Sequence, residues 1–282
     1  MALVMVAALF MALLFVIFKI FDRRSVPLFP AIVINYFTAA SCGIIASVPL
    51  PSDRLVPLVL PAVLLGGLFI ILFYVTAIST QRIGVAVTSV ATKMSLVVTV
   101  LFAVVFFHEE PGTWGWTGIG LALTGVVLAS WSPGPVGTRG MWMLPIALFL
   151  GNSAVDVVLI TVQRLVLVPA TEPVFITMVL GIAGSIGLLL LIIRGQFASL
   201  RDPKAAIAGV LLGLFNYASL HFIIGAIARS GFAASSLFPM MNIGVIIFGT
   251  IASIAIFKER IRNVQWAGIV CGVLAMAMIL LA

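Results

Sequence analysis

Long apolar stretches separated by short polar connections make up almost the whole chain. Stretches such as "LVMVAALFMALLFVIF" show no alternation of apolar and polar positions, which a membrane-spanning β-strand would require. A helix needs about 20 apolar residues to cross a bilayer, and it satisfies its own backbone hydrogen bonds there. The pattern therefore predicts ten spanning helices, over residues 2–20, 29–48, 56–79, 83–107, 113–131, 141–163, 173–193, 205–228, 232–257 and 263–281.

The composition excludes a water-soluble globule. The 282 residues are 63% hydrophobic and 8% charged, with a mean hydropathy of +1.33, whereas about a quarter of the residues in a soluble domain are charged. We therefore expect a multi-pass protein of the cell (inner) membrane. The first stretch has no clear cleavage site and runs into "KIFDRR", so we predict a retained helix and not a signal peptide.

Positive charge is scattered through the connections between the apolar stretches. The net charge is +7, but the basic residues form no run and no single face, so we expect no nucleic-acid partner. The odd-numbered connections hold eleven Lys and Arg residues, and the even-numbered connections hold three. The positive-inside rule then predicts that the odd connections lie in the cytoplasm and that both termini lie outside.

The chain resembles itself at a shift of 147 residues, which aligns residues 64–95 with 211–242. Each half then holds five predicted spans, and because five is odd, the second half enters the membrane in the opposite sense. This predicts an all-α membrane protein of two inverted five-helix repeats, residues 1–134 and 135–282, around a central cavity. The most specific matching pairs, including those after a three-residue adjustment, are Arg82/Arg229, Gly84/Gly231, Ala86/Ala233, Phe107/Phe257, Glu109/Glu259, Trp116/Trp266 and Gly118/Gly268.

In both repeats a helix rich in small residues ends in an acidic connection that leads to a glycine-rich helix. The two copies are "RIGVAVTSVATKMSLVVTVLFAVVFFHEE" with "WTGIGLALTGVVLAS", and "RSGFAASSLFPMMNIGVIIFGTIASIAIFKERIRNVQWAGIVCGVLAMAMI". Over essentially its whole length the chain resembles the EamA-type members of the drug/metabolite transporter superfamily. The resemblance implies ten helices and the transport of small metabolites through a central cavity. It also implies that both termini lie inside, in conflict with the charge count.

Lys93 and Asp156 lie deep within their predicted spans. Lys93 is about ten residues into the fourth span, or roughly 15 Å at 1.5 Å per residue. An ionised side chain there costs about 2.5–3.5 kcal/mol unless it faces a cavity or a partner. Asn152 lies one helical turn before Asp156. In one interpretation Lys93 anchors an anionic substrate and Asp156 carries protons or holds an amine. In the other, the two residues form a buried pair that docks the halves.

A second group of polar residues comes from spans two, three, four, eight and nine. The repeat alignment pairs Tyr74 with His221 and Ser95 with Asn242, so we expect these positions near the pseudo-two-fold axis, where such transporters bind substrate. The alternative for His221 and Asn242 is ordinary hydrogen bonding to neighbouring groups. Pro239 is predicted to kink the ninth span and to serve as a hinge. The further substrate candidates are Asn35, Asn216 and Tyr217.

Acidic residues also occur at helix ends. Glu109, Glu110 and Glu259, together with His108, fall in short connections. We interpret them as solvated ends, where a carboxylate near the start of the following helix is favoured by the helix dipole.

These observations predict a secondary active transporter that moves a small polar metabolite, such as an amino acid, by alternating access. The sequence contains no nucleotide-binding loop, H-E-x-x-H pair or G-x-S-x-G elbow, so we expect proton coupling or exchange, no cofactor or metal, and no enzymatic activity. The expected partners are the substrate, protons and the bilayer, with the chain acting as a monomer or a loose homodimer. A multidrug or lipophilic-cation exporter is the alternative. An intramembrane enzyme or a channel is the alternative from another class.

Overall fold

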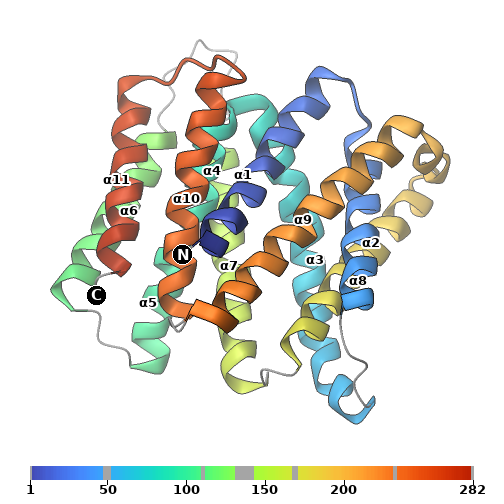
Figure 1. Cartoon of the computed structure of the whole chain (residues 1–282), viewed down its shortest axis with the longest axis horizontal. Helices are drawn as coiled ribbons and strands as arrows, with labels where there is room; N and C mark the ends of the chain where they lie inside the picture. Colours follow the sequence, from blue (N-terminus) through green and yellow to red (C-terminus); the bar gives the residue numbers. More distant parts are fainter. Residues whose placement is uncertain are drawn as a thin grey trace. The chain divides into compact units, whose positions relative to one another are not determined.

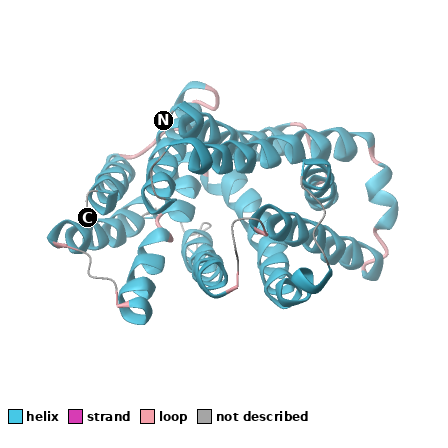
Figure 2. Cartoon of the chain, turned by 60° about the horizontal axis from the view of Figure 1, so that its bottom comes forward, coloured by secondary structure: helices cyan, strands magenta, loops and turns pink. Residues whose placement is uncertain are grey.

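The computed structural model describes residues 2–46, 52–108, 112–130, 143–166, 171–230 and 234–280. All the regular structure in these ranges is helical (Figure 2). Each of the ten apolar stretches carries a helix, and the fourth stretch carries two. The helices are α1 (Ala2–Arg23), α2 (Leu28–Ala46), α3 (Ser52–Ile83), α4 (Val85–Lys93), α5 (Leu96–Phe107), α6 (Thr113–Ser130), α7 (Met143–Leu165), α8 (Glu172–Ile193), η2 (Phe197–Arg201), α9 (Pro203–Ser230), α10 (Ala234–Ala255) and α11 (Asn263–Leu280).

Many of these helices have the length and composition of membrane spans. In the part of the chain that the structure describes, seven segments are long and apolar enough to cross a bilayer, and Met240–Ala255 and Asn263–Met278 are shorter apolar helices. The all-helical membrane fold is confirmed, whereas the count of ten crossings and the inverted repeat stay predictions. The seven segments are Ala2–Arg23, Leu28–Ala46, Leu55–Ile83, Val85–Phe106, Met143–Val162, Glu172–Ile193 and Pro203–Ile223.

The helices form two compact units, each assembled from separate parts of the sequence. Unit 1 contains residues 1–19, 75–153 and 219–282, and unit 2 contains residues 20–74 and 154–218. Each unit therefore draws helices from both halves of the sequence. The predicted repeat boundary between residues 134 and 135 lies outside the described residues.

The core of unit 1 encloses α4. One apolar cluster, which includes Phe15, Val85 and Val245, packs α4 with α1, α9 and α10. A second cluster, which includes Val90 and Ile269, packs α4 with α6, α10 and α11. Figure 1 shows α6 and α11 side by side at one edge of this unit. Because apolar neighbours surround α4, its hydroxyl-bearing side chains are buried inside the unit.

In unit 2, α2 packs against α8 and α9. Figure 1 shows α2 alongside α8. On α9, Gly209 and Gly213 form a Gly-x-x-x-Gly pair, the spacing that lets two membrane helices approach closely. A Cβ atom at Gly213 would lie 2.6 Å from Thr38 Cβ and 2.7 Å from the Asn35 carbonyl oxygen, both on α2. The backbones of α2 and α9 therefore touch at this point, beside a polar residue.

Candidate functional site

The fourth predicted span contains a break in its helix. We expected one continuous helix over 83–107, but α4 ends at Lys93 and α5 begins at Leu96. At the break, the Val97 N–H donates to the Met94 carbonyl at 3.1 Å, a three-residue bond in place of the usual four. The Ser95 hydroxyl donates to the Thr92 carbonyl at 2.9 Å. A serine or threonine hydroxyl that bonds to a backbone carbonyl in this way weakens or bends a helix slightly.

Lys93 is the last residue of α4 and stands directly at this break. Its side chain is half-buried, and Nζ donates to the Met11 thioether of α1 at 3.0 Å. A thioether is only a weak acceptor. Lys93, the predicted substrate anchor, thus contacts α1 within unit 1. It lies at the C-terminus of a short helix, whose last carbonyls point towards the break.

Asn152 and Asp156 lie one turn apart on α7, and both are half-buried. The Asn152 amide donates to the Leu148 carbonyl of its own helix at 2.8 Å. Asn152 belongs to unit 1 with Lys93, whereas Asp156 belongs to unit 2. The proposed pairing of Lys93 with Asp156 therefore stays a prediction.

Two predicted residues of unit 2 do come together. Asn216 on α9 donates from Nδ2 to Asn35 Oδ1 on α2, at 3.2 Å. Asn35 is fully buried, and among the described residues its own Nδ2 has no hydrogen-bond partner. A buried amide without a partner costs free energy, so this N–H₂ group is suited to a further acceptor such as a carboxylate or a water molecule.

The remaining aromatic candidates are divided between the units. Tyr217 is half-buried on α9 in unit 2. Tyr74, also in unit 2, packs edge-on against Phe29 with ring centroids 5.5 Å apart. His221 lies in unit 1, where its ring is exposed and edge-on to Phe222 at 5.8 Å. That Tyr74 and His221 both lie near a pseudo-two-fold axis stays a prediction.

Three further candidates lie in unit 1. Ser95 and Asn242 are both buried there, with exposed fractions of 3% and 8%, and their place near a pseudo-two-fold axis stays a prediction. Pro239 falls within α10, but its side chain lies outside the described part of the chain.

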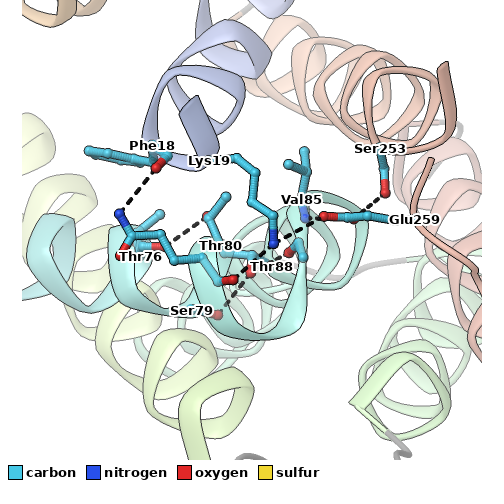
Figure 3. A network of polar contacts seen from close by, with 11 residues as sticks. Phe18, Lys19, Thr76, Ser79, Thr80, Val85, Thr88, Ser253 and Glu259 are labelled. Carbon is cyan, nitrogen blue, oxygen red and sulfur yellow. Dashed lines mark hydrogen bonds and ion pairs between the residues drawn. The ribbon is translucent and has the colours of Figure 1, made fainter. Parts of the chain in front are cut away.

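A polar network that was not predicted from the sequence joins α1, the junction of α3 and α4, and the connection between α10 and α11 (Figure 3). Lys19 Nζ on α1 lies 3.4 Å from Glu259 Oε1 and donates to the Gln81 carbonyl at 2.8 Å. Glu259 Oε2 accepts from the Val85 N–H at 3.2 Å and from the Ser253 hydroxyl. The side chains of Lys19 and Glu259 are only 17% and 20% exposed. Glu259 thus caps the N-terminus of α4, where the helix dipole favours negative charge.

Gly84 makes room for this carboxylate. Its φ of 99° is a conformation that other residues rarely adopt, and an added Cβ would lie 2.5 Å from Glu259 Oε2. The interpretation of Glu259 as a solvated end is therefore wrong. The repeated Arg-x-Gly and Phe-x-Glu pairs that end at Gly84 and Glu259 were the signal in the sequence. Of the other predicted ends, His108 is exposed, and Glu109 and Glu110 lie outside the described residues.

A cavity of about 250 Å³ adjoins the network. Lys19 on α1, Arg82 at the end of α3 and Arg260 in the connection between α10 and α11 all line it. The predicted orientation in the membrane stays a prediction.

Comparison with known proteins identifies the family. Residues 1–131 match the model of the EamA-like transporter family. Over those residues the chain is similar to this family. The resemblance to the drug/metabolite transporter superfamily is thereby confirmed. This similarity, together with the apolar helices, indicates a multi-pass membrane protein.

A relative extends the similarity beyond the first half of the EamA-like chain. An uncharacterized protein of Haemophilus influenzae (strain ATCC 51907 / DSM 11121 / KW20 / Rd) is 27% identical over 276 residues. The match covers 90% of this chain and 89% of that protein. The two proteins are therefore similar in length as well as in sequence.

Proposed function

We propose that this EamA-like protein is a secondary active transporter of the cell (inner) membrane, which moves a small polar metabolite such as an amino acid by alternating access. The observation that carries the proposal is the break in the fourth span at Lys93. Transporters build substrate sites from interrupted helices, because the backbone groups freed at the break can contact a ligand. In this proposal, proton coupling or exchange supplies the energy for transport.

The composition of the two units supports an internal repeat. The division between units falls between residues 74 and 75 and again between residues 218 and 219. These boundaries are 144 residues apart (219 − 75), close to the shift of 147 that aligns the two halves. Corresponding segments of the two halves therefore contribute to each unit, which is the arrangement expected of a duplicated five-helix element.

In this proposal the polar residues of the two units have different roles. Lys93 provides a positive charge for an anionic group of the substrate, and Asp156 carries protons or binds an amine. The Asn35–Asn216 pair offers an amide donor within unit 2, since Asn35 Nδ2 lacks a partner among the described residues. Within unit 1 the lysine suits an anionic group of the substrate, and within unit 2 the carboxylate suits an amine.

The experiment begins with a thermal-shift screen of the purified protein against a metabolite library at several pH values. A ligand that binds only the folded state raises the unfolding temperature, so a hit names the substrate class. Uptake of that metabolite is then measured in proteoliposomes. We expect Lys93→Ala and Asp156→Asn each to reduce transport at least tenfold while the protein stays monodisperse.

The matched controls are Lys204→Ala and Asp22→Asn, which remove the same charges from exposed positions. Both controls should transport at the wild-type rate. Full transport by Lys93→Ala and Asp156→Asn would refute these two residues as the substrate and coupling groups. A library without any hit, and no transport of amino acids in either direction, would count against the proposed substrate class.

A further inference from the structure

The cavity beside Glu259 carries more positive than negative charge. Among the residues that the structure describes, three cationic side chains line it, from Lys19, Arg82 and Arg260, against one carboxylate, that of Glu259. Lys19 already faces Glu259 at 3.4 Å. Arg82 and Arg260 are exposed, and neither makes a hydrogen bond or an ion pair with any residue that the structure describes. Within the described part of the chain, these two guanidinium groups border the cavity and have no ion-pair partner.

A third donor lies in the same wall. Gln265 lines the cavity, and its Oε1 accepts from the Arg262 N–H at 3.0 Å. With its oxygen engaged in this way, the amide of Gln265 still has its N–H₂ group as a donor. The lining thus combines two planar guanidinium groups and an amide, which are the groups that bind carboxylates and phosphates.

We propose that this cavity is a binding site for a small anion, in which Arg82 and Arg260 hold a carboxylate or phosphate group with the help of Gln265. Its volume of about 250 Å³ lies below the range of about 300–1,000 Å³ that is usual for drug-sized ligands, so it suits a small anionic group. The proposal goes beyond the proposed transport function, because binding at this position can be measured without transport.

Glu259 limits how strongly the site binds. Its carboxylate accepts a hydrogen bond from the Val85 N–H and forms an ion pair with Lys19. An anionic group of the protein itself therefore already lies in the lining of the cavity. A bound anion lies beside this carboxylate and is repelled by it. Neutralising Glu259 should therefore increase the affinity for an anion, an effect opposite to that of neutralising either arginine.

The anion has two possible sources with the same chemistry, a free phosphate and the headgroup of an anionic lipid. To separate them, the full chain is placed in nanodiscs of phosphatidylcholine alone or of phosphatidylcholine with phosphatidylglycerol. Inorganic phosphate is titrated at an ionic strength held constant with KCl, and the unfolding temperature is followed. A ligand that binds the folded protein produces a saturable rise.

For a free anion, we expect a saturable rise in the phosphatidylcholine discs. The apparent affinity should fall at least tenfold in Arg82→Gln and in Arg260→Gln and should rise in Glu259→Gln. For a lipid headgroup, phosphatidylglycerol alone should raise the unfolding temperature of the wild type, and either arginine variant should lose that rise. Lys258→Gln is the matched control, since it removes a charge from the same connection at an exposed residue outside the cavity.

Either pattern supports the site, and the pattern that is observed shows whether a free anion or a lipid headgroup binds there. The proposal is overturned if the wild type responds to neither phosphate nor phosphatidylglycerol. It is equally overturned if both arginine variants respond as the wild type and Lys258→Gln do. Because the side chains of Arg82 and Arg260 are exposed, their variants decide the question even if Glu259→Gln fails to fold.

Discussion

At the scale of single residues, Glu259 holds together parts of unit 1 that are distant in the sequence. Its carboxylate contacts a lysine on α1, a backbone N–H at the start of α4 and a hydroxyl near the end of α10. The acceptor is a carboxylate, so the hydrogen bonds from the N–H and the hydroxyl are charge-assisted and stronger than those between neutral groups. The connection between α10 and α11 is fixed against α1 and α4 through this one side chain.

Gly84→Ala should destabilise the protein, because it forces a side chain into a backbone conformation reserved for glycine and towards the Glu259 carboxylate. We expect a loss of about 1–3 kcal/mol in the free energy of unfolding, measured by denaturation in mixed micelles. Gly195→Ala is the matched control, since Gly195 also has a positive φ, of 65°, but an added Cβ would meet nothing within 4 Å. Equal losses in the two variants would show that contact with Glu259 adds no cost.

At the scale of helices, the sequence reveals close packing better than it reveals interruptions. Gly209 and Gly213 have the spacing of a helix-packing motif, and the structure places them against α2. The break after Lys93 has no such signature, because Met94 and Ser95 are neither glycine nor proline and leave the hydropathy of the span unchanged. Only the density of Ser and Thr before the break hints at it.

Gly213→Ala should push α9 away from α2, since the added methyl group would lie within 2.7 Å of atoms on both the side chain and the backbone of α2. Overpacking of this kind costs about 1–3 kcal/mol, which thermal unfolding of the purified protein would detect. Gly181→Ala is the control within the same unit, where the new Cβ would meet Ala40 at an ordinary 3.9 Å. If both variants unfold together at the wild-type temperature, the proposed contact between α2 and α9 is not tight.

At the scale of the whole molecule, composition and hydropathy were sufficient to predict an all-helical membrane protein, because a bilayer leaves few ways to satisfy a backbone. They could not predict the contacts that build the sites. Val85 and Glu259 lie 174 residues apart, and Asn35 and Asn216 lie 181 apart. Such pairings depend on how helices from both halves assemble into each unit, which no local pattern records.

The orientation in the membrane also belongs to this scale. The charge count predicts the odd-numbered connections in the cytoplasm and both termini outside. A C-terminal fusion should therefore show alkaline phosphatase activity and no GFP fluorescence. A fusion truncated after Gln196, in the seventh connection, should give the opposite result. A fluorescent C-terminal fusion would reverse the predicted orientation.

The capping of α4 by Glu259 has a consequence for how such sequences can vary. The hydrogen-bond donor at position 85 is the backbone N–H, so most other residues can replace Val85 without loss of this bond. Proline is the exception, because it has no backbone N–H. Positions 84 and 259 are not independent in this way, because a side chain at 84 would occupy the space of the acid. Related chains that carry another residue at position 84 should therefore lack the acid at position 259.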